Sequence, residues 1–114
     1  MKKPYKLDKL SEFVGNDKQQ IQEMITIFLE TIPPDIDKLK ILASEKNWPK
    51  VYEIAHRIKP SFDVFEMEDI LADIKNIEKI AREHNAEGTI VSDIKELSEN
   101  FSKIMLLLQL ELEK

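Results

Sequence analysis

The chain has 114 residues, no cysteine, only two glycines and a net charge of −5 at pH 7. Its length suits one domain with a hydrophobic core, and abundant Leu, Ile, Lys and Glu predict a single helical domain over 1–114. The lack of cysteine excludes disulfides and thiolate metal sites, and the acidic balance argues against nucleic acid as a partner.

No segment predicts export or membrane insertion. Met1 to Tyr5 are not followed by an apolar run of signal-peptide length, and the most apolar stretch, 104–108, is too short to cross a bilayer. We therefore expect a cytoplasmic protein that does not bind membranes, and the plain start at Met1 favours a free-standing one.

The first half of the chain predicts a short helix, a longer one and an interruption. The short helix ends at Gly15, and Asn16 or Asp17 caps the next. Pro33 and Pro34 should interrupt this second helix, because proline fits the first turn of a helix and not its interior. Whether the stretch from the cap to about residue 46 forms one kinked helix or two is left open.

Three further amphipathic helices are predicted. Asn47 caps a helix that ends near Phe65, and the next apolar stripe begins at about Met67 and ends around 85–88. The last helix has apolar residues at steps that alternate between four and three for most of its length. They are Ile90, Ile94, Leu97, Phe101, Ile104, Leu108 and Leu112.

Short connections between long amphipathic helices favour antiparallel neighbours. The predicted fold is therefore all-α, an antiparallel up-and-down four-helix bundle with an additional short N-terminal helix. The near-heptad last helix could instead form a coiled-coil dimer. Its single stripe can be covered by the other helices, so we expect a monomer.

His56 is one of two histidines, and it lies on the polar side of its helix. With each residue turning by about 100°, the apolar residues of this helix fall within about 60° of Val51, whereas His56 lies about 140° away. The imidazole should be exposed, and Lys59 can reach an anion carried by the ring.

His84 continues an apolar face and is interpreted as structural. No ligand spacing supports a metal site built on the two histidines.

Pro60 stands four residues after His56. A proline inside a helix removes a donor and clashes with the carbonyl four residues back, a destabilisation of about 3 kcal/mol. Here that carbonyl belongs to His56. We expect the helix to bend or loosen at this point, and the flat ring of Pro60 leaves the imidazole uncovered.

The run from Ala55 to Ser61, with hydrophobic residues at 58 and 65, resembles the signature of histidine-containing phosphotransfer (HPt) domains, and the resemblance covers most of the chain. It implies that His56 is phosphorylated, that Lys59 steadies the phosphoryl group and that Pro60 and Ser61 shape the site. The family commonly has glycine where Pro60 and Glu66 stand. Proline still keeps the flank of the histidine open, whereas Glu66 puts the turn at the end of this helix in question.

The resemblance also implies the partners. In the family, the phosphoryl group arrives from and leaves to an aspartate of a response-regulator receiver domain, in a relay that includes a sensor or hybrid histidine kinase. Mg²⁺ would come with the receiver domain, so no cofactor is expected on this chain. No Gly-rich phosphate loop occurs, which agrees with a phosphocarrier that is not itself an enzyme.

Partner docking is expected on apolar side chains near His56. The candidates are Phe13, Val14, Met24, Ile27, Phe28 and Tyr52. Two other functions stay open. One is a pseudo-HPt module that binds a receiver or kinase without being phosphorylated, and the other is a structural or oligomerisation domain built on the last helix.

Overall fold

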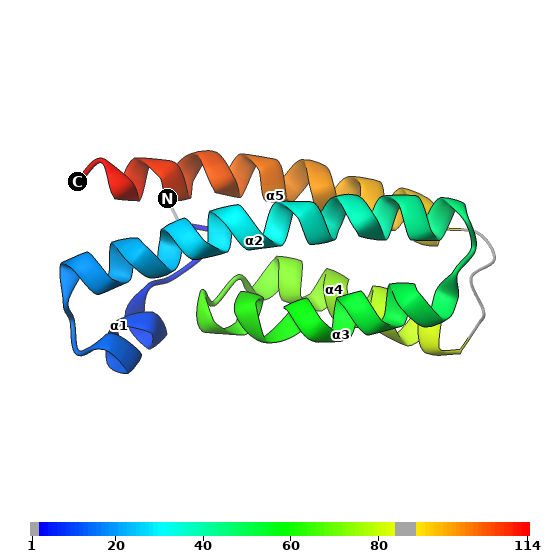
Figure 1. Cartoon of the computed structure of the whole chain (residues 1–114), viewed down its shortest axis with the longest axis horizontal. Coiled ribbons are helices and arrows are strands. Elements are labelled where there is room, and N and C mark those ends of the chain that lie inside the picture. The colour runs from blue at the N-terminus through cyan, green and yellow to red at the C-terminus, as the bar shows by residue number, and fades with distance from the viewer. Residues whose placement is uncertain (1–2, 84–88) are drawn as a thin grey trace.

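The computed structural model describes residues 3–83 and 89–114, and within them the chain forms five helices and no strand. A short helix, α1 (Asp8–Val14), precedes the four long helices α2 (Lys18–Ser44), α3 (Trp48–Val64), α4 (Glu68–Arg82) and α5 (Ile90–Leu112) (Figure 1). The all-α class predicted from the sequence is confirmed for these residues.

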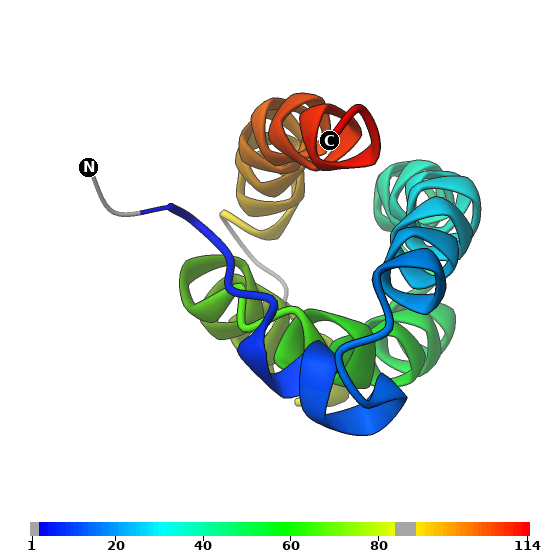
Figure 2. The ribbon, with the colours of Figure 1, turned by 90° about the vertical axis from the view of Figure 1, so that its left-hand side faces the viewer.

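The long helices pack in chain order. Consecutive ones run in opposite directions (Figure 1), and each contacts the next. α5 also packs against α2, so that α2 to α5 surround a common interior when the molecule is seen end-on (Figure 2). α3, the helix that contains His56, therefore lies between α2 and α4.

The interior is built from the apolar stripes that the sequence predicts. On α3 the whole stripe from Val51 to Phe65 is buried, and on α5 every predicted position except the half-buried Leu112 is buried. Burying one such large side chain stabilises the fold by roughly 1.5–3 kcal/mol. Four phenylalanines meet at the centre with ring centroids 4.4 to 5.8 Å apart. They are Phe28, Phe62, Phe65 and Phe101.

α2 does not stop at the proline pair. The expected interruption at Pro33 and Pro34 is wrong, because the helix is continuous from Lys18 to Ser44. Ile32 and Ile36 are both buried on the two sides of the prolines. Their packing stabilises the helix across the two positions at which a backbone donor is missing.

α3 is likewise continuous through Pro60 and ends at Val64. The side chain of Asn47 caps its first turn and accepts a hydrogen bond from the Lys50 amide at 3.4 Å. At the start of α2 the capping residue is Asp17, which accepts from two amides of the first turn. Both caps were predicted from the sequence, with Asn16 as the alternative for α2.

The turns after α2 and α3 use left-handed residues other than glycine. Lys46 has φ of 57° and Glu66 has φ of 50°. Each turn has the paired backbone hydrogen bonds of a Schellman motif; in the second, Glu66 N donates to Asp63 O and Met67 N to Phe62 O, both at 3.0 Å. Glu66 thus occupies a conformation that favours glycine, and its carboxylate accepts from the Lys9 amide of α1 at 3.5 Å.

The ends of the chain are tied together on one side of the molecule. Tyr5 is buried, and its hydroxyl donates a 2.7 Å hydrogen bond to Glu111 near the end of α5.

α4 ends at Arg82, somewhat earlier than the 85–88 region expected from the sequence. His84 and the rest of that region lie outside the described residues.

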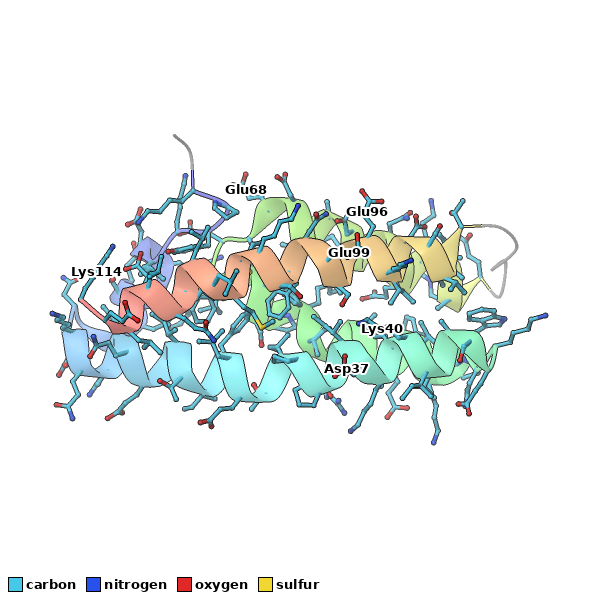
Figure 3. All side chains as sticks on the ribbon, turned by 90° about the horizontal axis from the view of Figure 1, so that it is seen from above. Asp37, Lys40, Glu68, Glu96, Glu99 and Lys114 are labelled. Carbon is cyan, nitrogen blue, oxygen red and sulfur yellow. The ribbon has the colours of Figure 1, made fainter. Side chains whose placement is uncertain are left out.

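Many charged side chains lie on the outer surface. Figure 3 shows such side chains along the helices, among them Asp37 and Lys40 on α2 and Glu99 on α5, all of them exposed. In the described parts of the chain, no helix combines the length and the apolar character needed to cross a membrane.

Candidate functional site

His56 is exposed on α3, as the helical pattern predicts. Its side chain keeps 60% of its surface accessible. Tyr52, one turn earlier and half-buried, stacks on the imidazole with ring centroids 5.8 Å apart and an angle of 14° between the planes. The stacked ring limits the orientations that the imidazole can adopt while leaving it open to solvent.

A carboxylate from α4 reaches the same ring. Glu78 Oε2 lies 3.5 Å from His56 Nδ1 and 3.0 Å from Lys59 Nζ, and Lys59 also donates to Oε1 at 3.3 Å. Glu78 is the only charged residue in the described chain that is buried. Two α3 side chains thus converge on one shielded carboxylate.

Burial of Glu78 requires compensation, because an isolated charge in the interior is strongly destabilising. Lys59 supplies it, since its side chain is only 28% exposed and its ammonium contacts both carboxylate oxygens. Oε2 itself is shielded from solvent and has no hydrogen bond of good geometry within the described structure. A donor at the imidazole Nδ1 would satisfy this oxygen after a small closure of the 3.5 Å gap.

The carboxylate also decides which ring nitrogen faces outward. An ionised carboxylate only accepts hydrogen bonds, so the ring nitrogen next to it is favoured as the one that bears hydrogen. Nδ1 is that nitrogen in His56, which leaves the Nε2 lone pair free on the side away from Glu78. The arrangement therefore presents Nε2 as a nucleophile.

Sequence reasoning missed Glu78. A signal was present, because Glu78 lies only about 40° from Ile74 at the edge of the apolar stripe of α4, and buried glutamates are rare unless paired. The helical pattern of α4 does not reveal which other helix this edge faces. That information comes from the packing of α4 against α3.

The structure brings some of the predicted docking residues together. Met24 and Ile27 on α2 meet Pro60 and Ser61 on α3 around a hollow of about 200 Å³ that also contacts Phe28. Met24 is 37% and Ile27 52% exposed, so this apolar rim is accessible.

The other predicted docking residues lie outside this hollow. Phe13 on α1 is 73% exposed, and Val14 and Tyr52 are half-buried. Asp63, on the same side of α3 as His56, forms a 3.0 Å ion pair with Lys9 of α1. Asp63 thus helps to attach α1, and the apolar hollow is built by α2 and α3 around Pro60, four residues after His56.

In the described part of the chain, no group of three or more His, Cys, Asp or Glu side chains is placed to hold a metal ion. Comparison of the chain with protein-family models, with curated proteins and with solved structures gave no match.

Proposed function

We propose that the protein is a histidine phosphotransfer protein of a two-component phosphorelay, with the phosphoryl group bound to Nε2 of His56. In this proposal residues 1–114 form one HPt domain, a monomeric and cytoplasmic antiparallel up-and-down four-helix bundle with a short N-terminal helix. The observation that carries the proposal is an exposed imidazole whose Nδ1 faces the buried Glu78 carboxylate at 3.5 Å. This geometry favours nucleophilic attack through Nε2.

The transfer step follows from that geometry. Nε2 attacks the phosphorus of a receiver phosphoaspartate, the N–P bond forms, and the P–O bond to the aspartate breaks with its electron pair left on the carboxylate. The hydrogen stays on Nδ1, so the phosphorylated ring is cationic, and Glu78 offsets this charge. Attack by the aspartate of the next receiver reverses these bond changes.

The receiver domain would supply the metal ion for the transfer. Mg²⁺ bound by the receiver domain would neutralise the transferring phosphoryl group, and this chain would supply the nucleophile, the Lys59 cation and a docking surface. The apolar hollow between Met24, Ile27 and Pro60 supports docking about one helical turn from His56, since accessible apolar surface marks interaction sites.

Incubation with a phosphorylated receiver domain tests the proposal. The wild-type chain should acquire an acid-labile phosphate, and the His56→Gln variant should not. Lys59→Ala should accept phosphate more slowly while it keeps its helical circular dichroism. Label that persists in His56→Gln would exclude His56 as the carrier.

The second candidate is a pseudo-HPt module that binds a receiver or kinase domain without being phosphorylated. The observation in its favour is that the Lys59 ammonium is occupied by Glu78, at 3.0 Å from Oε2. Stable binding of a receiver domain with no acid-labile phosphate on His56 would support this candidate over the first.

A further inference from the structure

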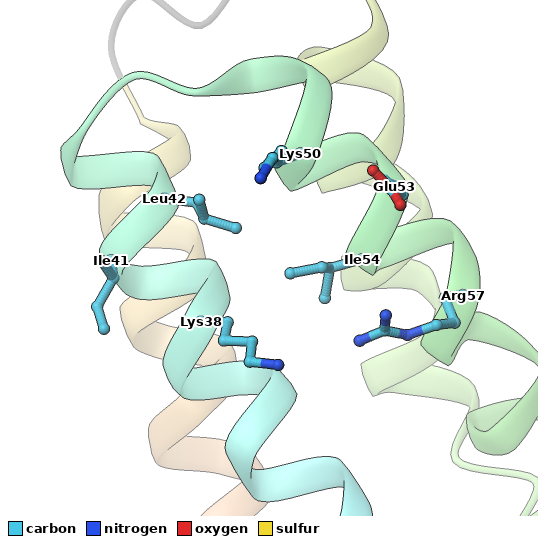
Figure 4. A pocket seen from close by; sticks show the side chains of 7 residues that line it. All are labelled: Lys38, Ile41, Leu42, Lys50, Glu53, Ile54 and Arg57. Carbon is cyan, nitrogen blue, oxygen red and sulfur yellow. The ribbon is translucent and has the colours of Figure 1, made fainter.

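A second hollow, of about 390 Å³, lies between the C-terminal half of α2 and the N-terminal half of α3 (Figure 4). Leu42 and Ile54 supply apolar side chains from its two walls, and Ile41, which is 59% exposed, also lines it. In Figure 4 the side chains of Lys38 and Arg57 extend toward each other across the opening. The hollow is thus apolar on its walls between the helices and cationic at its opening.

The charge of this hollow is opposite to that of the protein. Three cations line it together with one carboxylate, Glu53, on a chain whose net charge is −5. Arg57 already has an acidic partner, Asp35, at 2.6 Å. Lys38 and Lys50 form no ion pair with any other described residue. The two lysines are therefore available to an anionic ligand.

The hollow is separate from the histidine site. Viewed along α3, Lys50 and Arg57 lie roughly 100–120° from His56 on the side of α2, whereas Lys59 lies about 60° from it on the other side. The His56 ring itself faces Glu78 on α4. A ligand in the hollow would leave the imidazole uncovered.

We propose that this hollow docks an acidic peptide segment of a partner protein. An aliphatic side chain of the segment inserts between Leu42 and Ile54, and its carboxylates pair with Lys38 and Lys50. A membrane surface fits less well, since Ile54 is buried and Leu42 is half-buried between the helices, and neither projects as a bilayer contact would. The binding requires no phosphate, so it stands independently of the phosphotransfer proposal.

Fluorescence anisotropy with a synthetic probe tests the site. The probe is a short fluorescein-labelled peptide with two leucines one helical turn apart and glutamates on both sides. It should bind the wild-type chain saturably, and added salt should weaken the binding. Combining Lys38→Glu with Lys50→Glu should raise the Kd by about 10-fold or more, equivalent to about 1.4 kcal/mol. His56→Gln should leave the Kd of the peptide unchanged.

Matched controls separate the site from general electrostatics. Lys75→Glu with Lys95→Glu changes the net charge equally at exposed positions of α4 and α5, and should preserve binding. Peptides with glutamine in place of the leucines, or of the glutamates, should each bind at least several-fold more weakly. Equal weakening by both double variants, equal binding of all three peptides, or no saturable binding up to about 1 mM would overturn the proposal.

Discussion

At the scale of single residues, the candidate site depends on one buried charge. The carboxylate of Glu78 contacts both the ring of His56 and the ammonium of Lys59, and both of these residues come from a different helix. A carboxylate so placed can accept a hydrogen bond from Nδ1 and so fix the orientation of the ring. The same residue also links α3 to α4 through an ion pair.

We predict that Glu78→Gln slows phosphorylation of His56. Glutamine keeps the size of the side chain but removes the charge that orients the ring, so the initial rate should fall by roughly 10- to 100-fold, the range found for residues that orient histidines in metal sites. The measurement is the initial rate of labelling by a phosphorylated receiver domain, with circular dichroism to verify folding.

Glu99→Gln is the matched control for this variant. Glu99 is exposed on α5, so the substitution removes the same charge away from the site and should leave the rate unchanged. If Glu78→Gln accepted phosphate at the wild-type rate, the carboxylate would have no part in activating the imidazole.

At the scale of helices and turns, the turns after α2 and α3 each place a residue other than glycine in the left-handed backbone region. Glu66 lies in the left-handed region, which glycine adopts most easily, and Lys46 takes the same conformation after α2. A residue with a Cβ is destabilised there by roughly 1–2 kcal/mol. The Schellman hydrogen bonds of both turns compensate for this strain.

Lys46→Gly should therefore stabilise the protein. Glycine relieves the strain at φ of 57° but has more freedom in the unfolded chain, so we expect the free energy of unfolding to rise by about 1 kcal/mol or slightly less. Urea unfolding at neutral pH measures the change. Lys46→Ala retains the Cβ and should give no comparable gain. Equal stabilities of the two variants would show that no strain is stored at this turn.

At the scale of the whole molecule, the charges are unevenly distributed. Cations line the hollow between α2 and α3, whereas four carboxylates gather where α4 meets α5. Partial removal from water raises the pKa of Asp73, and the carboxylates of Glu96, Asp69 and Asp93 raise it further. The folded protein therefore binds a proton at Asp73 more readily than the unfolded chain does.

Asp73→Asn should stabilise the protein at neutral pH. The pKa of Asp73 in the folded protein lies above its ordinary value of 3.8. The contribution of Asp73 to stability is therefore fully present below pH 3.8 and is lost as the pH rises through the folded pKa. Asparagine is neutral at every pH. The free energy of unfolding of the variant should therefore exceed that of the wild type at pH 7, and this difference should disappear in acid. Asp73 is largely exposed to solvent, so the gain should stay below about 1 kcal/mol.

Chemical denaturation at neutral and at acidic pH measures this difference. Asp37→Asn is the control, because Asp37 is exposed on α2 and lies 3.6 Å from Lys40. This variant should show no gain at neutral pH. Equal gains in the two variants would attribute the effect to net charge rather than to the carboxylates around Asp73.

The sequence by itself determined the local features of this protein. The end of α1, the limits of α3, the cap at Asn47 and the exposure of His56 all follow from the spacing of apolar residues and from capping chemistry, which act within a few residues. For α2 the same chemistry narrowed the cap to Asn16 or Asp17, and Asp17 is the residue that caps the helix. The same spacing predicted which residues of α3 and α5 are buried.

Only the tertiary structure decided the features that depend on contacts between helices. Packing of Ile32 and Ile36 keeps α2 continuous across two prolines that local rules treat as a break. Packing of α4 against α3 brings Glu78 to His56, and packing of α2 against α3 builds the two hollows. Each of these results is set by the register between two helices, and a helical pattern specifies the buried face of one helix without specifying the neighbour that covers it.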